Sequence, residues 1–498
     1  MKHLRLGLAA LITTAASAAA CATVWFAVGA IAGPAAAGSP AVVATVVALS
    51  LARRSVSGRR EFARSAAFLP VIGVAAAGVG WLLVAVPALG ALLYIAGMSV
   101  PIWLRRFGPF AARLGALIAL PLTAVLVVPV VPVEPGTSQS PWSAALLTAG
   151  AGVVAVLWVA VAREVLGLLR LGSGPDPGPG DPAAPAPGAP IQRTTGPTTS
   201  SSASRRLPAS TRMAIQMAVA LAAAFVVGWL VFPQHAMWVV LTAFIVNSGN
   251  RGRGDVLHKS ALRVGGAVAG TVLALGLAAA APSASGFAAV VVVFVALFAG
   301  TWLRSYSYAF WALAVTVVLT ILQQLFGVSP AAGEAGLLVE RVLAIVVGAL
   351  LGIAAAWFVL PVRSTDVLRR RLADLLVALG AVLKDDADDT DERAARTAAF
   401  GAALRRVEEL APAHRARRRF GGGRIQPIDC IDAASALGRA MEARGRAAEQ
   451  LRVPPERREQ VRDALRQARA SLASPVDLER VRSRLTALVS ALQHGPVA

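Results

Sequence analysis

One unit occurs twice in this sequence, and the two copies are separated by a constant 199 residues. The run Trp103, Leu104, Arg105 recurs as Trp302, Leu303, Arg304, and Trp158 recurs as Trp357. Three basic positions keep the same spacing, since Arg54, Arg60 and Arg64 correspond to Arg253, Lys259 and Arg263. Self-similarity at a fixed period indicates a repeated structural unit. We therefore expect two equivalent halves, about 24–171 and about 223–370.

The composition places this repeat in a membrane. Hydrophobic residues make up 56% of the 498 residues and charged residues only 15%, which is too apolar for an ordinary soluble protein. A helix crosses the hydrocarbon core with about 17–25 apolar residues. Twelve candidate spans lie near 6–30, 38–52, 65–86, 88–104, 114–132, 142–162, 213–232, 237–249, 261–281, 286–303, 308–326 and 338–360. The predicted fold is all-α, a polytopic membrane protein with two parallel six-helix transmembrane repeats.

The basic residues predict how the spans are oriented. Lys and Arg near span ends stay on the cytoplasmic side. Arginine-bearing loops, such as 53–64, 105–113 and 251–263, alternate with connections that contain no Lys or Arg. Twelve spans with both termini in the cytoplasm satisfy this rule throughout. Only three of the 48 basic residues are lysines, and alanine is abundant, which indicates a GC-rich bacterial genome and hence a bacterial plasma membrane.

The N-terminal segment has an alternative interpretation as a secretory signal. A basic start precedes an apolar run that reaches small residues before Cys21, and cleavage there would remove the first span. The apolar run continues through Trp25 and Ile31, however, and the second copy has a matching span at 213–232. We therefore expect the segment to be retained.

Composition divides the chain into four parts. Residues 1–171 and 213–363 hold the two repeats, and 172–212, rich in Pro, Gly and Ser, form a flexible cytoplasmic linker. Residues 364–498 hold 19 of the 27 acidic residues and are expected to form a cytoplasmic helical domain. Its leucines recur at helical spacing: Leu368, Leu372, Leu375, Leu376, Leu379, then Leu465, Leu472, Leu478, Leu485, Leu488 and Leu492. This pattern predicts a bundle of four or five amphipathic helices.

Several function classes are disfavoured. The net charge of +21 is explained by basic loops between spans, so it does not indicate nucleic-acid binding. Cys21 and Cys430 are too far apart in the sequence to indicate a disulfide framework or a metal site. No nucleophile, base and acid constellation and no metal-ligand spacing emerges, so we expect neither an enzyme nor a cofactor.

Two stretches carry a family resemblance. Residues 238–246 form a Trp-led apolar span, WVVLTAFIV, and after a basic loop residues 263–271 read RVGGAVAGT. This pair resembles the fusaric-acid-resistance-like family of aromatic acid exporters. The resemblance covers about 210–362 and is weaker in the first copy, where Ser65, Ala66 and Ala67 stand opposite Val264, Gly265 and Gly266.

The resemblance implies export of aromatic or other amphipathic organic acids, driven by the proton gradient. Two other functions stay open. One is a passive anion channel, because plant aluminium-activated malate channels look like relatives of the same membrane unit. The other is a structural membrane protein whose tail docks a partner. The expected partners are membrane lipids and small organic anions, with a homo-oligomer or a protein partner bound through the tail as further possibilities.

Charged residues near the last span are the candidates for proton coupling. Glu340 and Arg341 form an adjacent charged pair at the outer end of the second copy. Charges at such depth are costly and suggest a relay. The alternative, which the sequence favours, puts Glu340 in the first turn of the helix, where the helix dipole stabilises it. Arg341 would then extend to the lipid headgroups.

Three further sets complete the candidate site residues. Polar residues in or beside spans bond to neighbouring helices or line a substrate pathway; they are Gln216, Asn247, Gln323 and Gln324. Basic residues at the inner mouth orient the chain or attract anionic substrates; they are Arg251, Arg253, Lys259 and Arg263. Small residues let helix backbones approach closely; they are Gly265, Gly266 and Gly270.

Overall fold

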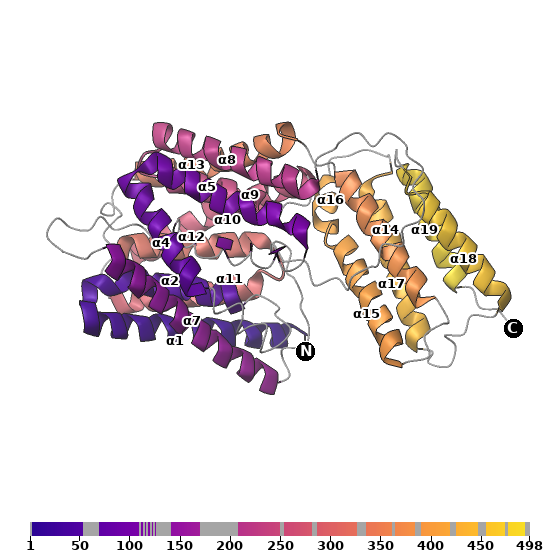
Figure 1. The fold of residues 1–498 in the computed structure, drawn as a ribbon, viewed down its shortest axis with the longest axis horizontal. Helices are drawn as coiled ribbons and strands as arrows, with labels where there is room; N and C mark the ends of the chain where they lie inside the picture. The colour runs from indigo at the N-terminus through magenta and orange to yellow at the C-terminus, as the bar shows by residue number, and fades with distance from the viewer. Residues whose placement is uncertain are drawn as a thin grey trace. The chain divides into compact units, whose positions relative to one another are not determined.

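A computed structural model describes residues 2–52, 69–108, scattered positions between 111 and 125, 141–169, 208–249, 253–280, 286–325, 335–360, 364–383, 390–418, 425–446, 455–473 and 477–493. All regular structure in these ranges is helical, and they contain no strand (Figure 1). The chain divides into two compact units, one of Met1–Asn250 with Lys259–Leu360 and one of Arg251–His258 with Pro361–Ala498. The all-α prediction is therefore confirmed for the described part of the chain.

The first unit holds the apolar helices. They are α1 (Lys2–Ala32), α2 (Pro34–Ala52), α4 (Leu69–Ala85), α5 (Pro87–Leu104), the short 3₁₀ helix η1 (Arg105–Phe107), α7 (Pro141–Leu168), α8 (Ala209–Val231), α9 (Ala236–Asn247), α10 (Arg253–Ala280), α11 (Gly286–Leu303), α12 (Tyr308–Leu325) and α13 (Ala335–Phe358). Within the described residues, eight helices are long and apolar enough to cross a membrane, and three shorter apolar helices accompany them. The chain is a multi-pass membrane protein.

The helix boundaries follow local chemistry. Proline begins α2, α5 and α7, a position where the amide that proline lacks has no partner in the helix. Gly33, with φ of +87°, makes the turn between α1 and α2 in a conformation that favours glycine. The predicted span 114–132 lies mostly outside the described residues, as does the predicted linker 172–212 except for 208–212. Since α8 begins at Ala209, the second repeat starts four residues before its predicted boundary.

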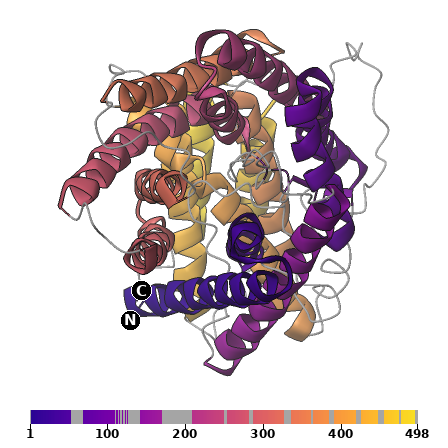
Figure 2. The same ribbon diagram turned by 90° about the vertical axis from the view of Figure 1, so that its left-hand side faces the viewer.

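Equivalent helices of the two halves make equivalent contacts. In the first half α1, α2 and α7 pack against one another, and in the second half α8, α9 and α13 do the same (Figures 1 and 2). Contacts between the halves also correspond, because α5 packs on α8 while α11 packs on α1. Helix α11 begins and ends 199 residues after α5, the spacing of the sequence repeat. These correspondences agree with a duplicated unit.

Aromatic packing joins the halves where α5 meets α8. Tyr94 of α5 and Phe225 of α8 are both buried, and their rings lie 5.8 Å apart at 78°. This edge-to-face geometry is favourable for aromatic pairs. Trp229, one turn further along α8, lies 5.3 Å from Phe225.

The second unit forms a helical bundle with its own hydrophobic core. The second unit includes the first turns of α10, up to His258. Its other helices are α14 (Ser364–Val382), α15 (Thr390–Glu408), α16 (Ala411–Arg418), α17 (Pro427–Arg446), α18 (Pro455–Ala470) and α19 (Leu478–Gln493). The periodic leucines predicted to face a core do so, with Leu478 only partly buried. The described tail thus has six helices rather than four or five. The prediction did not use Pro412, in the first turn of α16, or Pro475, which lies between α18 and α19 in the sequence.

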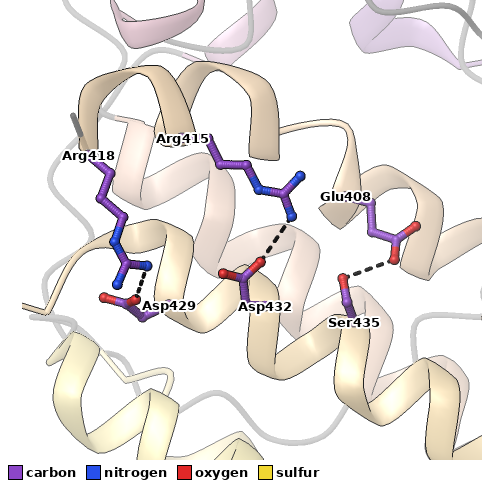
Figure 3. A network of polar contacts seen from close by, with 6 residues as sticks. All are labelled: Glu408, Arg415, Arg418, Asp429, Asp432 and Ser435. Atoms are coloured by element: carbon purple, nitrogen blue, oxygen red, sulfur yellow. Dashed lines mark hydrogen bonds and ion pairs between the residues drawn. The ribbon is translucent and has the colours of Figure 1, made fainter.

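Polar contacts between α15, α16 and α17 lie at the edge of this bundle (Figure 3). Arg418 Nη1 donates to Asp429 Oδ1 at 2.7 Å, and Arg415 Nη2 donates to Asp432 Oδ1 at 3.1 Å. Ser435 Oγ donates to Glu408 Oε1 at 2.9 Å. Mostly exposed ion pairs add little stability, so the apolar core holds the bundle.

Candidate functional site

Arg341 is buried inside the membrane unit, with 2% of its surface exposed. Its Nη1 donates to Thr320 Oγ1 at 2.7 Å, and its Nη2 donates to the Thr316 carbonyl oxygen at 3.1 Å. Its guanidinium carbon lies 3.8 Å from the centroid of the Trp238 ring. The interpretation that Arg341 extends to headgroups is wrong, because α12 and α9 supply acceptors and an aromatic face that keep the side chain inside.

Two threonines one turn apart on α12, Thr316 and Thr320, accept the hydrogen bonds of Arg341. Thr316 Oγ1 donates to the Ala312 carbonyl at 2.8 Å, and Thr320 Oγ1 donates to the Thr316 carbonyl at 2.8 Å. Since each hydroxyl hydrogen is used within the helix, the Thr320 oxygen is left as an acceptor for Arg341. The sequence interpretation missed these threonines, although their four-residue spacing in an apolar span was the available signal.

Arg263 is a second buried arginine, 1% exposed, in α10. It was predicted as part of the inner-mouth basic loop, but it lies in the membrane unit's interior. Its Nε and Nη2 find no hydrogen-bond acceptor among the residues that the structure describes. The side chain interacts electrostatically with Tyr308 and with Arg341. Two guanidinium groups in the same buried region therefore act on each other.

Negative charge does not compensate these two arginines in the described part of the chain. No Asp or Glu side chain there is buried, and the electrostatic partners of Arg263 and Arg341 include no carboxylate. A buried charge without a counter-charge is strongly unfavourable. In membrane spans such residues mark substrate or ion pathways. The arrangement can stabilise an anion.

The comparisons with known proteins concern the same helices. Residues 218–355 match the model of a family described as fusaric acid resistance protein-like. This confirms the predicted family resemblance. The fusaric acid resistance protein-like segment includes Trp238, Arg263, Thr316, Thr320 and Arg341. Comparison with curated proteins found no match.

Two titratable groups meet within this family-matched segment. Glu340 Oε1 lies 3.5 Å from His235 Nδ1, and their side chains are 31% and 13% exposed. Burial lowers the pKa of His235, and Glu340 opposes this by favouring the protonated ring. Arg341 acts in the same direction as burial. The pair is a candidate for proton exchange.

The four polar residues predicted for a substrate pathway do not form one cluster. Gln216 Nε2 donates to the carbonyls of Val359 and Leu360 at 2.8 and 3.2 Å, and so caps the end of α13. Asn247 Nδ2 donates to the Ala243 carbonyl of its own helix at 3.0 Å. Gln323 Oε1 lies 3.5 Å from Arg341 Nη1, whereas Gln324 is exposed. Of these four residues, only Gln323 contacts the arginine site, which comprises Arg263 and Arg341 with the residues that surround them, Trp238, Tyr308, Thr316 and Thr320.

The basic loop is likewise divided. Lys259 is buried, and its Nζ donates to the carbonyls of Ser248 and Gly249 at 3.4 and 3.3 Å, just after α9 ends. A cation at a helix C-terminus is favourable. Arg251 lies outside the described residues, and for Arg253 only the backbone is described. A substrate-attracting role of this loop stays a prediction.

Glycines of α10 bring the helix close to α12 and thereby position the threonines. A Cβ at Gly266 would lie 2.7 Å from Ala312 Cβ, and one at Gly270 would lie 2.9 Å from Thr316 Cβ. Gly265 has no neighbour within 4 Å of such a Cβ. The predicted packing role therefore does not extend to Gly265, because adjacent residues on a helix point in different directions.

In the described ranges, no group of three or more His, Cys, Asp or Glu side chains is placed to hold a metal ion. The arginine site consists of hydrogen-bond donors and aromatic rings. Such groups bind anions and orient them, and they do not ligate cations.

Proposed function

We propose that the chain is a membrane transporter that exports aromatic or other amphipathic organic acids, driven by the proton gradient. One observation carries the proposal: Arg263 and Arg341 are buried in the membrane unit without a buried carboxylate in the described residues. An organic acid supplies the missing negative charge. The match of residues 218–355 to a resistance-protein family supports transport rather than catalysis.

The direction of transport rests on the predicted orientation. With both termini in the cytoplasm of a bacterial cell, the hairpin that carries His235 faces outward. A cysteine introduced at His235 should then react with an impermeant thiol reagent applied to intact cells, in a variant that lacks Cys21 and Cys430. Labelling only after the cells are opened would reverse the orientation and with it the assignment as an exporter.

Proton coupling is assigned to the pair of Glu340 and His235. At a separation of 3.5 Å, a proton on the His235 ring is stabilised by the Glu340 carboxylate. Both side chains are partly exposed, so protons can reach them. The charged group next to them is Arg341, whose position beside the pair ties their protonation to the charge of the arginine site.

Reconstituted vesicles test the proposal. The full chain in proteoliposomes should move radiolabelled benzoate uphill under an imposed pH gradient, at a rate above that of protein-free vesicles. Glu340→Gln should abolish uphill movement, whereas the matched exposed change Glu164→Gln in α7 should not. Downhill flux that carries current without proton movement would favour an anion channel. Flux equal to that of protein-free vesicles would favour a structural role with a partner bound to the tail.

A further inference from the structure

Arg263 presents one complete hydrogen-bonding edge that has no partner in the described part of the chain. The atoms that find no acceptor among the described residues are Nε and Nη2. These two nitrogens lie on the same edge of the planar guanidinium group and direct their hydrogens in parallel. This edge binds a carboxylate through two hydrogen bonds.

Arg341 is arranged differently. Its two terminal nitrogens donate to Thr320 and Thr316, and in the described ranges only Nε of its donors is buried without a partner. Arg341 can therefore add positive potential to the site, but it offers no free pair of parallel donors. Arg263 is therefore suited to bind a carboxylate directly, whereas Arg341 is suited to raise the positive electrostatic potential around it.

We propose that the Nε and Nη2 edge of Arg263 is the binding site for one carboxylate of the transported acid, with Arg341 as a positioning residue that supplies a second positive charge. The inference deepens the proposed function and rests on it for the identity of the ligand as an organic acid. One free edge accepts one carboxylate, so the favoured class is an apolar or aromatic monocarboxylate rather than a dicarboxylate.

The position of Arg263 agrees with this role. It precedes Gly266 by one turn of α10, where the backbone packs directly on α12, and it interacts electrostatically with Tyr308 at the start of α12. The arginine is thus held on rigid packed helices rather than on a loop. Preorganised donors on such elements bind with less loss of entropy.

A structural role for Arg263 makes the opposite prediction for stability. If the arginine held the helices together, its removal would destabilise the unit. If its charge is unpaired until a ligand binds, replacing it with an apolar side chain of similar length should raise the stability of the ligand-free protein. The variant Arg263→Met separates the two cases without measuring transport.

The experiment measures thermal unfolding and calorimetric binding for the purified full chain in detergent, with benzoate as the probe. Benzoate should raise the melting temperature of the parent, and benzamide, its neutral isostere, should not. Arg263→Lys, which keeps the charge but loses the edge, should weaken benzoate binding about tenfold or more, or about 1.4 kcal/mol. Arg263→Met should melt higher than the parent without ligand and show no response to benzoate.

Arg212→Met is the matched control. Arg212 belongs to the same unit, and its Nε donates to the Leu360 carbonyl at 3.1 Å, so the variant should keep parental benzoate affinity.

Unchanged affinity in Arg263→Lys and Arg263→Met would overturn the site, as would equal stabilisation by benzamide or chloride or no response of the parent. Benzoate binding that depends on Arg263, without uphill transport, would keep the site and overturn the exporter. Uphill transport retained in Arg263→Met would do the reverse.

Discussion

The guanidinium group of Arg341 lies over the ring of Trp238, with 3.8 Å between the guanidinium carbon and the ring centroid. The two residues come from α13 and α9, which pack along each other, and both are buried. Attraction between a cation and an aromatic face is strongest where water is excluded. This contact links the arginine site to α9, the helix that contains the Trp-led stretch 238–246 of the family resemblance.

A double-mutant cycle measures this contact. Trp238→Leu, Arg341→Met and the double variant should give a coupling energy of about 2 kcal/mol, because the pair is desolvated. The measurement is unfolding of the detergent-solubilised chain by a denaturing detergent. If the two single changes add to the double change within about 0.5 kcal/mol, the residues do not interact energetically.

Glycine substitutions on α10 should divide into two classes. Gly270→Ala should destabilise the membrane unit by about 1–3 kcal/mol, because a Cβ there would overlap the backbone and side chains of α12. Gly265→Ala, which meets open space, should be neutral or stabilising by up to about 1 kcal/mol, since alanine favours a helix over glycine. Melting temperatures of the two variants compared with the parent decide it. Equal losses would show that Gly265 also packs against a helix.

Two neighbouring aspartates of α17 should differ in their contribution to the tail. Asp429 lies in the first turn of α17 and accepts hydrogen bonds from the Gln426 amide, at 2.9 Å, and from Arg418. Among the contacts drawn in Figure 3, Asp432 accepts from the exposed Arg415. Asp429→Ala should lower the stability of α17 by about 1–2 kcal/mol through the lost cap. Asp432→Ala should change it by less than about 0.5 kcal/mol. Amide hydrogen exchange of α17 in the full chain measures both, and a larger loss in Asp432→Ala would contradict the assignment.

Cys430 should be unreactive in the folded chain. Burial raises the pKa of its thiol to about 12, and the Sγ donates to the Leu478 carbonyl at 3.3 Å. Because the thiolate is the reactive form, maleimide labelling of a Cys21→Ala variant at pH 8 should be slow and should become fast on denaturation. The raised pKa also means that the folded tail loses stability as pH rises above the ordinary thiol value of 9.0 towards 12. Labelling at equal rates in the folded and denatured chain would refute the burial of this thiol.

The stretches 238–246 and 263–271 carried the family resemblance. Hydropathy and the position of the arginines were sufficient to predict a helical multi-pass chain. Those properties depend on averages over many residues, and on the requirement that backbone groups in lipid bond within helices. The leucines of the tail were assigned to a core for the same reason, since periodicity alone decides which face of a helix is apolar.

Individual polar side chains were decided only by the tertiary structure. The sequence interpretation placed Arg263 in a loop and Arg341 at the lipid headgroups, whereas both side chains lie buried. The acceptors and the aromatic ring that hold Arg341 come from other helices, α12 and α9. Gln216 caps the end of α13 through a contact 143 residues away in the chain. Lys259 donates to carbonyls at the end of the preceding helix, α9. A pattern along one helix specifies which way a side chain points, but the partner it meets depends on how the helices pack.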